Sequence, residues 1–415
     1  MTLLNRALNK HWSFRLSDII LLVTVFPYIS FRLLPGDLQP YYFLASLVYV
    51  YWRYPGFRLR EKVYLCPLLA CLLLLPIGSS FDAAIATRAV ATYATPLLLV
   101  NVYLDIDMYL PSARAKAASF CDKSFKIIVI LSGLAGLIQF MFGPQVFYLL
   151  IAVRTSEGRG VTSIYSEPSL YGLSLCICLL YFCCIRKSRW KQYCLAALVQ
   201  IVLLSQSSIA IVIAALTLLA MNLRLKYILI WIFVFLFGGF LLFQLFNQGS
   251  FRVASVISSA ISDPLSLVQL DGSINERAHH ILLSLKSWGI PKGFFSFDQQ
   301  ITASLRSNPY FWAGDETLKI MSGFGAAFWE IGFVSLTFIC YPSFIAAKMY
   351  GAKNGVLLGI CLLVVFANNI TFAHPFYSLL VAALSSEHRR LPRPNGSVSD
   401  SYLADYQTHK CRNYG

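Results

Sequence analysis

Long apolar stretches alternate along the chain with short polar turns. Segments such as 126–142, 170–185 and 227–246 are long enough to cross a bilayer core of roughly 30 Å as helices. The expected transmembrane helices lie near 17–34, 40–54, 63–77, 83–103, 124–142, 169–185, 191–205, 208–222, 226–247, 320–346, 355–372 and 375–386. The pattern therefore predicts an all-α polytopic membrane protein with about twelve transmembrane helices.

Short basic clusters mark one side of this arrangement. With twelve helices, every cluster falls on the side of the N-terminus, beside the end of an apolar segment. The clusters are 53–62, 114–126, 186–191, 224–226, 348–353 and 388–393. Because cytoplasmic loops are rich in Lys and Arg, this side is predicted to be the cytoplasm. An eleven-helix alternative would move the C-terminus across the membrane but leave the long loops in place.

Composition supports a membrane protein and excludes two other classes. Hydrophobic residues make up 57% of the 415 residues and charged residues 13%, which excludes an ordinary soluble globular protein. The net charge of +15 could suggest nucleic-acid binding. Its placement beside helix ends instead indicates topology and contact with anionic lipid, so no nucleic-acid partner is expected.

Two long loops, about 143–168 and 248–319, interrupt the pattern on the opposite, predicted periplasmic side. Residues 1–388 then form a single transmembrane domain, and 389–415, rich in Pro, Ser and Asp, form a disordered cytoplasmic tail. A protein whose task is confined to the bilayer needs no such loops. Chemistry or recognition is therefore expected on this membrane face.

The first loop carries charged residues close to the start of a helix. Arg154 and Arg159 could bind phosphate, because a guanidinium group matches phosphate bidentately. Glu167 could orient an arginine or act as a base. Alternatively, Ser166 or Glu167 caps the helix, Pro168 occupies its first turn, and the loop charges are only solvated.

The second loop contains one amphipathic segment, 275–293, which is predicted to form a short helix lying on the membrane surface and stopped by Gly289 and Pro291. Its apolar face contains Ala278, Ile281, Leu282, Leu285 and Trp288. A polar stripe along one edge of that face contains Arg277, His280, Ser284 and Ser287.

Within this segment His279 is expected to point elsewhere, with Lys286, so His280 is the better candidate for chemistry. Arg252 and Arg306 lie near the two ends of the loop and could add positive potential. Amphipathic loop helices are common, however, and a purely structural surface helix remains the alternative.

Several polar residues fall inside the predicted transmembrane helices, where ionisable groups are costly and often functional. Arg88 lies near the outer end of its helix, Glu330 lies deeper, and Asn368 and His374 lie near the outer end of another helix. Glu330 is expected to have a functional role or to pair with a loop arginine. Interhelical hydrogen bonding is the alternative for the others.

The sequence contains none of the common soluble-enzyme motifs. We find no Walker loop, zinc-spaced His/Cys set, nucleophile elbow or dinucleotide fingerprint. Asp105 and Asp107 have the form of a metal-binding pair for nucleotide sugars. They lie at the inner end of a predicted helix, so a helix-end charge pair is favoured over a metal site.

With these features in view, the chain resembles the O-antigen polymerase family (Wzy-type), within the wider group of multispan lipid-linked glycan polymerases and ligases. The architecture of helices and loops carries the resemblance over most of the chain. The sharper matches are 159–169, 204–208, Arg277 followed by Gly289 and Gly293, and Glu330-Ile-Gly332. The distance from Arg277 to Gly289 is one residue longer than the family's usual pattern.

The resemblance implies a donor glycan repeat on undecaprenyl pyrophosphate and a second lipid-linked repeat as acceptor, at the periplasmic face of a bacterial inner membrane. It implies that arginines hold the pyrophosphate, with no metal or cofactor, and that Glu167 or His280 takes the acceptor's proton. The phosphate-binding set would be Arg88, Arg154, Arg159 and Arg277, supported by Glu330, Arg252 and Arg306. A chain-length regulator and a flippase are the implied membrane partners.

Two other functions remain open at this point. An O-antigen ligase, which joins finished glycan to a lipid core, would share the architecture and the arginine chemistry. A flippase or other transporter would not be an enzyme. It would have charges lining a central cavity, small loops and, often, matching broken helices in its two halves, whereas the halves here differ in loop size and charge.

Overall fold

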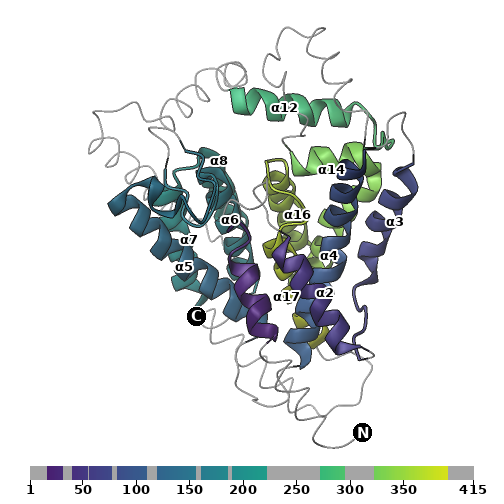
Figure 1. Cartoon of the computed structure of the whole chain (residues 1–415), viewed down its shortest axis with the longest axis horizontal. Coiled ribbons are helices and arrows are strands. Elements are labelled where there is room, and N and C mark those ends of the chain that lie inside the picture. Colours follow the sequence, from purple (N-terminus) through teal and green to yellow (C-terminus); the bar gives the residue numbers. More distant parts are fainter. Residues whose placement is uncertain are drawn as a thin grey trace, which may run out of the picture.

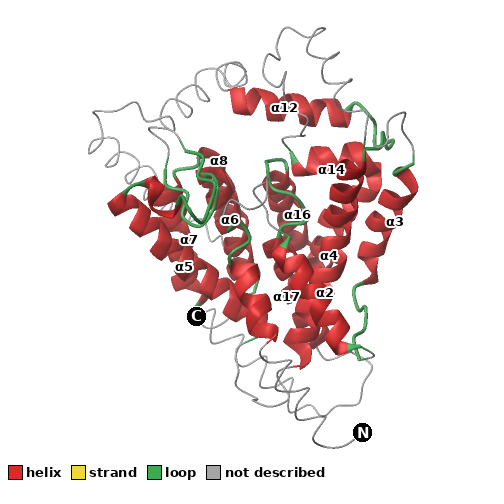
Figure 2. Cartoon of the chain, viewed as in Figure 1, coloured by secondary structure: helices red, strands yellow, loops and turns green. Residues whose placement is uncertain are grey.

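The computed structural model describes residues 16–30, 40–54, 56–76, 82–109, 119–155, 160–185, 189–221, 272–294 and 322–390. Every regular element in these ranges is helical (Figure 2), so the expected all-α fold is confirmed. Three helices are long and apolar enough to cross a membrane: Ile85–Met108, Phe120–Phe142 and Gly323–Tyr350. They are compatible with a membrane protein, and the count of about twelve spans stays a prediction.

Most of the named helices are shorter than these three. A short apolar helix, Leu16–Val25, comes first. The others are α2 (Tyr41–Arg53), η1 (Lys62–Tyr64), α3 (Leu65–Leu74), α4 (Ala83–Tyr109), α5 (Phe120–Phe142), η3 (Pro144–Phe147), α6 (Pro168–Cys184), α7 (Trp190–Val199), η4 (Gln200–Ser205), α8 (Ser208–Met221), α12 (Gly272–Leu285), α14 (Gly323–Ile331), η5 (Gly332–Leu336), α15 (Thr337–Tyr350), α16 (Ala352–Phe366) and α17 (Pro375–Arg390).

Two helices form the buried centre of the bundle. Every residue of α6 from Leu170 to Cys184 is buried, and so is α17 from Pro375 to Ser386. Figure 1 shows α2, α3 and α4 on one side of this centre and α5, α7 and α8 on the other. A helix that is apolar all round fits such a position, because each of its faces meets another helix.

The outer helix α5 has the polarity expected of a protein surface in lipid. Its Leu134, Phe140 and Phe142 side chains are exposed, whereas Asp122 and Gln139 are buried on its inner face. In water such an arrangement would leave a large apolar patch in contact with solvent. Exposed apolar patches of this kind mark contact with a membrane or a partner.

At one end of the bundle, which we call the basic end, acidic residues of α4 and α5 pair with cations. Arg53 Nε lies 3.1 Å from Asp105 Oδ2, and Arg390 Nη2 lies 2.9 Å from Asp107 Oδ2. The C-terminal ends of α2, α4 and α17 therefore meet here. The expected charge pairing of the two aspartates at the end of this helix is confirmed.

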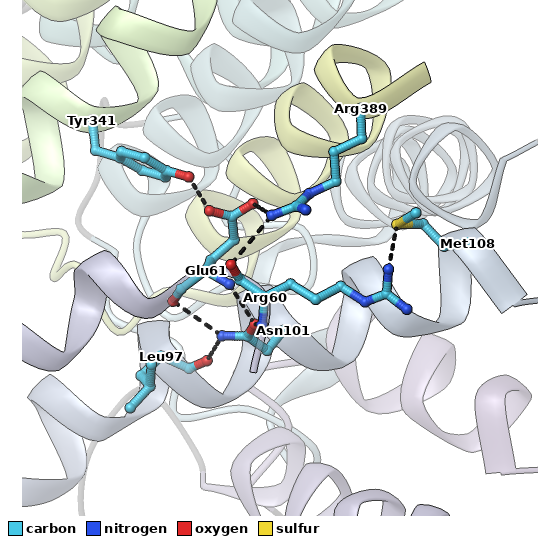
Figure 3. Close-up of polar contacts among 7 residues, drawn as sticks. All are labelled: Arg60, Glu61, Leu97, Asn101, Met108, Tyr341 and Arg389. Carbon is cyan, nitrogen blue, oxygen red and sulfur yellow. Dashed lines mark hydrogen bonds and ion pairs between the residues drawn. The ribbon is translucent and has the colours of Figure 1, made fainter. Parts of the chain in front are cut away.

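A second cluster at the basic end surrounds Glu61 (Figure 3). Arg389 Nη2 lies 2.9 Å from Glu61 Oε1, and the Tyr341 hydroxyl donates to the same carboxylate. Asn101 Oδ1 accepts the backbone N–H groups of Arg60 and Glu61 at 2.6 and 2.8 Å. These contacts join α4, α15 and α17, and α17 continues through Arg389 into this cluster. Residues 391–415, most of the predicted tail, lie outside the described residues.

The opposite end, which we call the loop end, carries the described parts of both long loops. Figure 1 shows α12 lying across this end, next to α14, with the connection between α5 and α6 beside α8. The N-terminal end of α4 and the C-terminal end of α16 also lie here, because the opposite ends of these two helices lie at the basic end. Several of the described residues that the sequence singled out for chemistry, among them Arg154, Glu167, Arg277 and His280, belong to segments at this end.

Candidate functional site

Helix α12 forms as predicted. Its polar side faces the bundle and its apolar side faces outward, the reverse of a helix on a protein surface in water. The polar side chains of the predicted stripe, His280, Ser284 and Ser287, are buried. Leu282 and Leu285, on the predicted apolar face, are exposed. His279 is also buried, so the expectation that it points away with the exposed Lys286 is wrong. The interior-facing side of α12 therefore carries both histidines.

The turn that follows α12 is fixed to α14 and η5 by backbone contacts. The N–H of Lys292 donates to the carbonyl of Trp329 at 2.9 Å, and the N–H of Phe333 donates to the carbonyl of Gly289 at 3.2 Å. A methyl group on Gly332 would collide with that same Gly289 carbonyl. The segments 289–293 and 330–332, both of which carried the family resemblance, are thus in direct contact.

Farther along α12, two side chains reach the neighbouring helices. Arg277 Nη1 donates to Asn368 Oδ1, just after α16, at 3.4 Å. A methyl group on Gly325 of α14 would lie 3.3 Å from Ser284 Oγ. The arginine is therefore partly buried at the boundary between α12 and the bundle, rather than pointing into solvent as a free loop cation.

Burial, together with the neighbouring His279, lowers the pKa of His280 to about 4. Burial lowers the pKa of His279 as well, with a smaller effect from Lys286. Both groups lose hydration when α12 packs, and this disfavours the charged imidazolium. At neutral pH His280 is therefore uncharged, and its buried imidazole is a weaker base than that of an ordinary histidine.

This pKa predicts an acid-dependent loss of stability. Above pH 6.5, the ordinary value, His280 is neutral in both the folded and the unfolded protein. As the pH falls from 6.5 toward 4, the unfolded chain takes up a proton that the folded chain does not, so the free energy of unfolding decreases. We expect His280→Gln to show a smaller fall in melting temperature than wild type between pH 7 and pH 5, measured by thermal unfolding in detergent.

The comparison variant is His279→Gln, which keeps His280 and should retain part of the wild-type pH dependence. Identical losses of melting temperature in the wild type and in His280→Gln would contradict the assignment of a buried, neutral His280.

The first loop places Arg154 and Glu167 together. Arg154 Nη2 lies 3.3 Å from Glu167 Oε1, Ser169 Oγ donates to Glu167 Oε2 at 3.1 Å, and the N–H of Arg154 donates to the Ser166 carbonyl at 2.7 Å. Pro168 begins α6, as expected, but neither Ser166 nor Glu167 caps it with its side chain. The carboxylate orients the arginine, which is about half exposed at 52%.

The segment 160–167, expected as a surface loop, is instead almost wholly buried. The Ser163 hydroxyl donates to the Ser132 carbonyl at 2.6 Å, and the Ser163 N–H donates to Gln139 Oε1 at 2.5 Å. Ser132 lies roughly 15 Å along α5 from its end at Phe142, at 1.5 Å per residue. The loop therefore re-enters the bundle before α6 begins.

Contacts with the next helix hairpin hold this re-entrant segment. The N–H of Val161 donates to the Leu204 carbonyl at 2.8 Å, and a methyl group on Gly160 would collide with the Ser205 carbonyl. Leu204 and Ser205 belong to η4, a π-helical turn, a form that occurs often at functional sites. Irregular backbone at membrane depth is tolerated only when protein or a water-filled cavity surrounds it. The segments 160–169 and 204–208 are thus direct neighbours.

A third polar group lies beneath the end of α12. The Tyr93 hydroxyl donates to Glu330 Oε2 at 2.6 Å, and the ring of Phe294 lies 6.2 Å from the Tyr93 ring. Arg88, on the same helix as Tyr93, is exposed. Glu330 therefore has a tyrosine partner on α4 that sequence analysis did not identify.

Three of the predicted site residues are not described by the structure. Arg159, Arg252 and Arg306 lie outside the described residues. Within the described ranges, no group of three or more His, Cys, Asp or Glu residues could hold a metal ion. Sequence analysis also missed Gln139, for which a buried-amide pattern within an apolar helix was the available signal.

Comparison with models of known protein families, with curated protein sequences and with solved structures gave no match.

Proposed function

We propose that this chain polymerises glycan repeats linked to undecaprenyl pyrophosphate, at the periplasmic face of a bacterial inner membrane and without a metal or cofactor. The resemblance to O-antigen polymerases suggests this activity. The observation that carries it is the inward-facing polar side of α12, which holds Arg277 and His280 at the loop end of an apolar bundle. A chain-length regulator and a flippase would be membrane partners.

A lipid-linked pyrophosphate fits this location chemically. Its polyprenyl chain requires hydrocarbon, and its two phosphates require cations at the membrane boundary. Arg277 is held on the bundle by Asn368, and Arg154 is held by Glu167, so both guanidinium groups are oriented. Oriented guanidinium groups bind phosphate bidentately, and they stabilise charge that develops on a leaving group. Arg159 and Arg88 would complete the phosphate-binding set.

In the proposed reaction, the hydroxyl oxygen of the acceptor's terminal sugar attacks the anomeric carbon of the donor. The bond from that carbon to the pyrophosphate oxygen breaks, and undecaprenyl pyrophosphate leaves with the bonding electrons. The hydroxyl proton passes to Glu167 or His280. His280 is neutral at pH 7, but its lowered pKa makes it a weak base while it stays buried, and both carboxylate oxygens of Glu167 are engaged by Arg154 and Ser169.

The first test is a gel of the surface glycan from a strain that lacks the gene. We expect the ladder of glycan lengths to collapse to a single repeat on the lipid core, because translocation and ligation continue without polymerisation. Restoring the gene should restore the ladder.

Loss of all repeats would contradict polymerase activity and indicate one of the alternatives. Lipid-linked polymer accumulating outside would then indicate a ligase. Single lipid-linked repeats accumulating inside would indicate a flippase.

A further inference from the structure

An exposed apolar strip runs along the outward side of α12 and the turn that follows it. The exposed fractions are 47% for Leu282, 45% for Leu285, 81% for Trp288 and 61% for Ile290. These residues lie on the side of the segment opposite the buried polar stripe. We call the four residues the α12 apolar strip.

The α12 apolar strip continues onto a helix that can cross a membrane. Phe333, which belongs to the candidate span Gly323–Tyr350, is itself 62% exposed. Its ring lies against Gly289, where an added methyl group would collide with it, and its N–H donates to the Gly289 carbonyl. The strip and the outward face of the span therefore form one continuous apolar surface.

The polarity of α12 identifies the medium around it. In water, an amphipathic helix buries its leucines and exposes its polar stripe. Here His280 and Ser284 are buried against the bundle, whereas Leu282 and Leu285 face outward. This orientation is stable only where the outward side meets an apolar medium.

We propose that the α12 apolar strip is inserted into the hydrocarbon of the lipid leaflet at the loop end, with Trp288 at the level of the headgroups. Trp favours this interfacial position because its ring is apolar and its N–H is polar. The exposed side chains of Lys286 and Lys292 flank the strip, where their ammonium groups can reach lipid phosphates.

The inference goes beyond the proposed function, because a ligase or a transporter could be anchored in the same way. It also has a geometric consequence. If one side of α12 contacts lipid, then Arg277 on its other side lies close to headgroup depth, within reach of a phosphate attached to a lipid chain.

Fluorescence of Trp288 tests the proposal in the full-length protein reconstituted in phospholipid vesicles. The signal of this residue is the difference between the wild type and Trp288→Phe. We expect lipids brominated near the headgroup to quench this signal strongly, lipids brominated near the chain end to quench it less, and aqueous iodide to quench it little. Trp329→Phe gives the matched control, since buried Trp329 should be quenched by none of these.

Strong quenching by iodide with none by brominated lipid would overturn the proposal, because the strip would then face water. Quenching by neither would overturn it as well, because protein, such as a second copy of this chain, would cover the strip.

A second variant makes the test independent of Trp288 itself. Leu282→Ser combined with Leu285→Ser should weaken insertion, so that Trp288 emission shifts to longer wavelength and becomes accessible to iodide. Leu134→Ser combined with Leu137→Ser, at two exposed leucines of α5, should leave the brominated-lipid quenching of Trp288 in place. An unchanged Trp288 signal in the double variant would contradict insertion through this strip.

Discussion

Replacing Arg277 with alanine is expected to lower the rate of glycan polymerisation by roughly 10²–10³-fold, the usual cost of removing one donor that stabilises a developing anion. Arg277 lies on the inward side of α12, and Asn368 holds its guanidinium at 3.4 Å. Alanine removes both the positive charge and the paired N–H donors of the guanidinium group. The measurement is polymer formation by purified protein in lipid vesicles supplied with lipid-linked repeats.

Two further variants make the result specific. Arg277→Lys keeps the charge but loses the bidentate geometry, so it should recover only part of the activity. Lys286→Ala removes an exposed cation from the same helix and should leave the rate near that of wild type. Full-length polymer from Arg277→Ala at normal expression would remove Arg277 from the proposed mechanism.

The second large effect is expected from Gly332→Ala, which should detach the end of α12 from α14. Gly332 has φ 63° and ψ −144°, a conformation that costs other residues about 1–3 kcal/mol. Its added methyl group would also collide with the Gly289 carbonyl, and overpacking of this kind costs about 1–3 kcal/mol more. We expect a lower melting temperature and faster amide hydrogen exchange in residues 280–290.

Gly351→Ala is the matched control for this variant. Gly351 has a similar backbone conformation, with φ 92° and ψ 156°, but an added methyl group would meet nothing within 4 Å. It should therefore lose stability through backbone strain alone and leave exchange in α12 unchanged. Equal exchange in α12 for both variants would show that the contact between Gly332 and Gly289 does not hold that helix.

Local patterns predicted α12 well and its surroundings poorly. The spacing of Ala278, Leu282 and Leu285 on one face, and of His280 and Ser284 on another, follows from helix geometry and requires no tertiary information. Which face turns inward depends on the medium outside and on the helices beneath. Those are properties of the assembled bundle, and the structure places the polar face inside.

The two side-chain pairs of the candidate site, Arg154 with Glu167 and Tyr93 with Glu330, also differ in how far the sequence could predict them. Glu167 and Arg154 are close in sequence, and their pairing could be anticipated as one of the roles open to a loop carboxylate. The partnership of Tyr93 with Glu330 joins residues of α4 and α14 that are distant in sequence. No periodicity within either helix encodes such a contact.

The sequence by itself determined the all-helical fold, the basic clusters beside the helix ends and the existence of an amphipathic helix within 275–293. These features depend on residue type and on spacing within a few turns. Only the tertiary structure decided that the segment before Glu167 re-enters the bundle and that α12 turns its polar side inward. Both depend on hydrogen bonds and packing between distant segments, which form only once the helices have assembled.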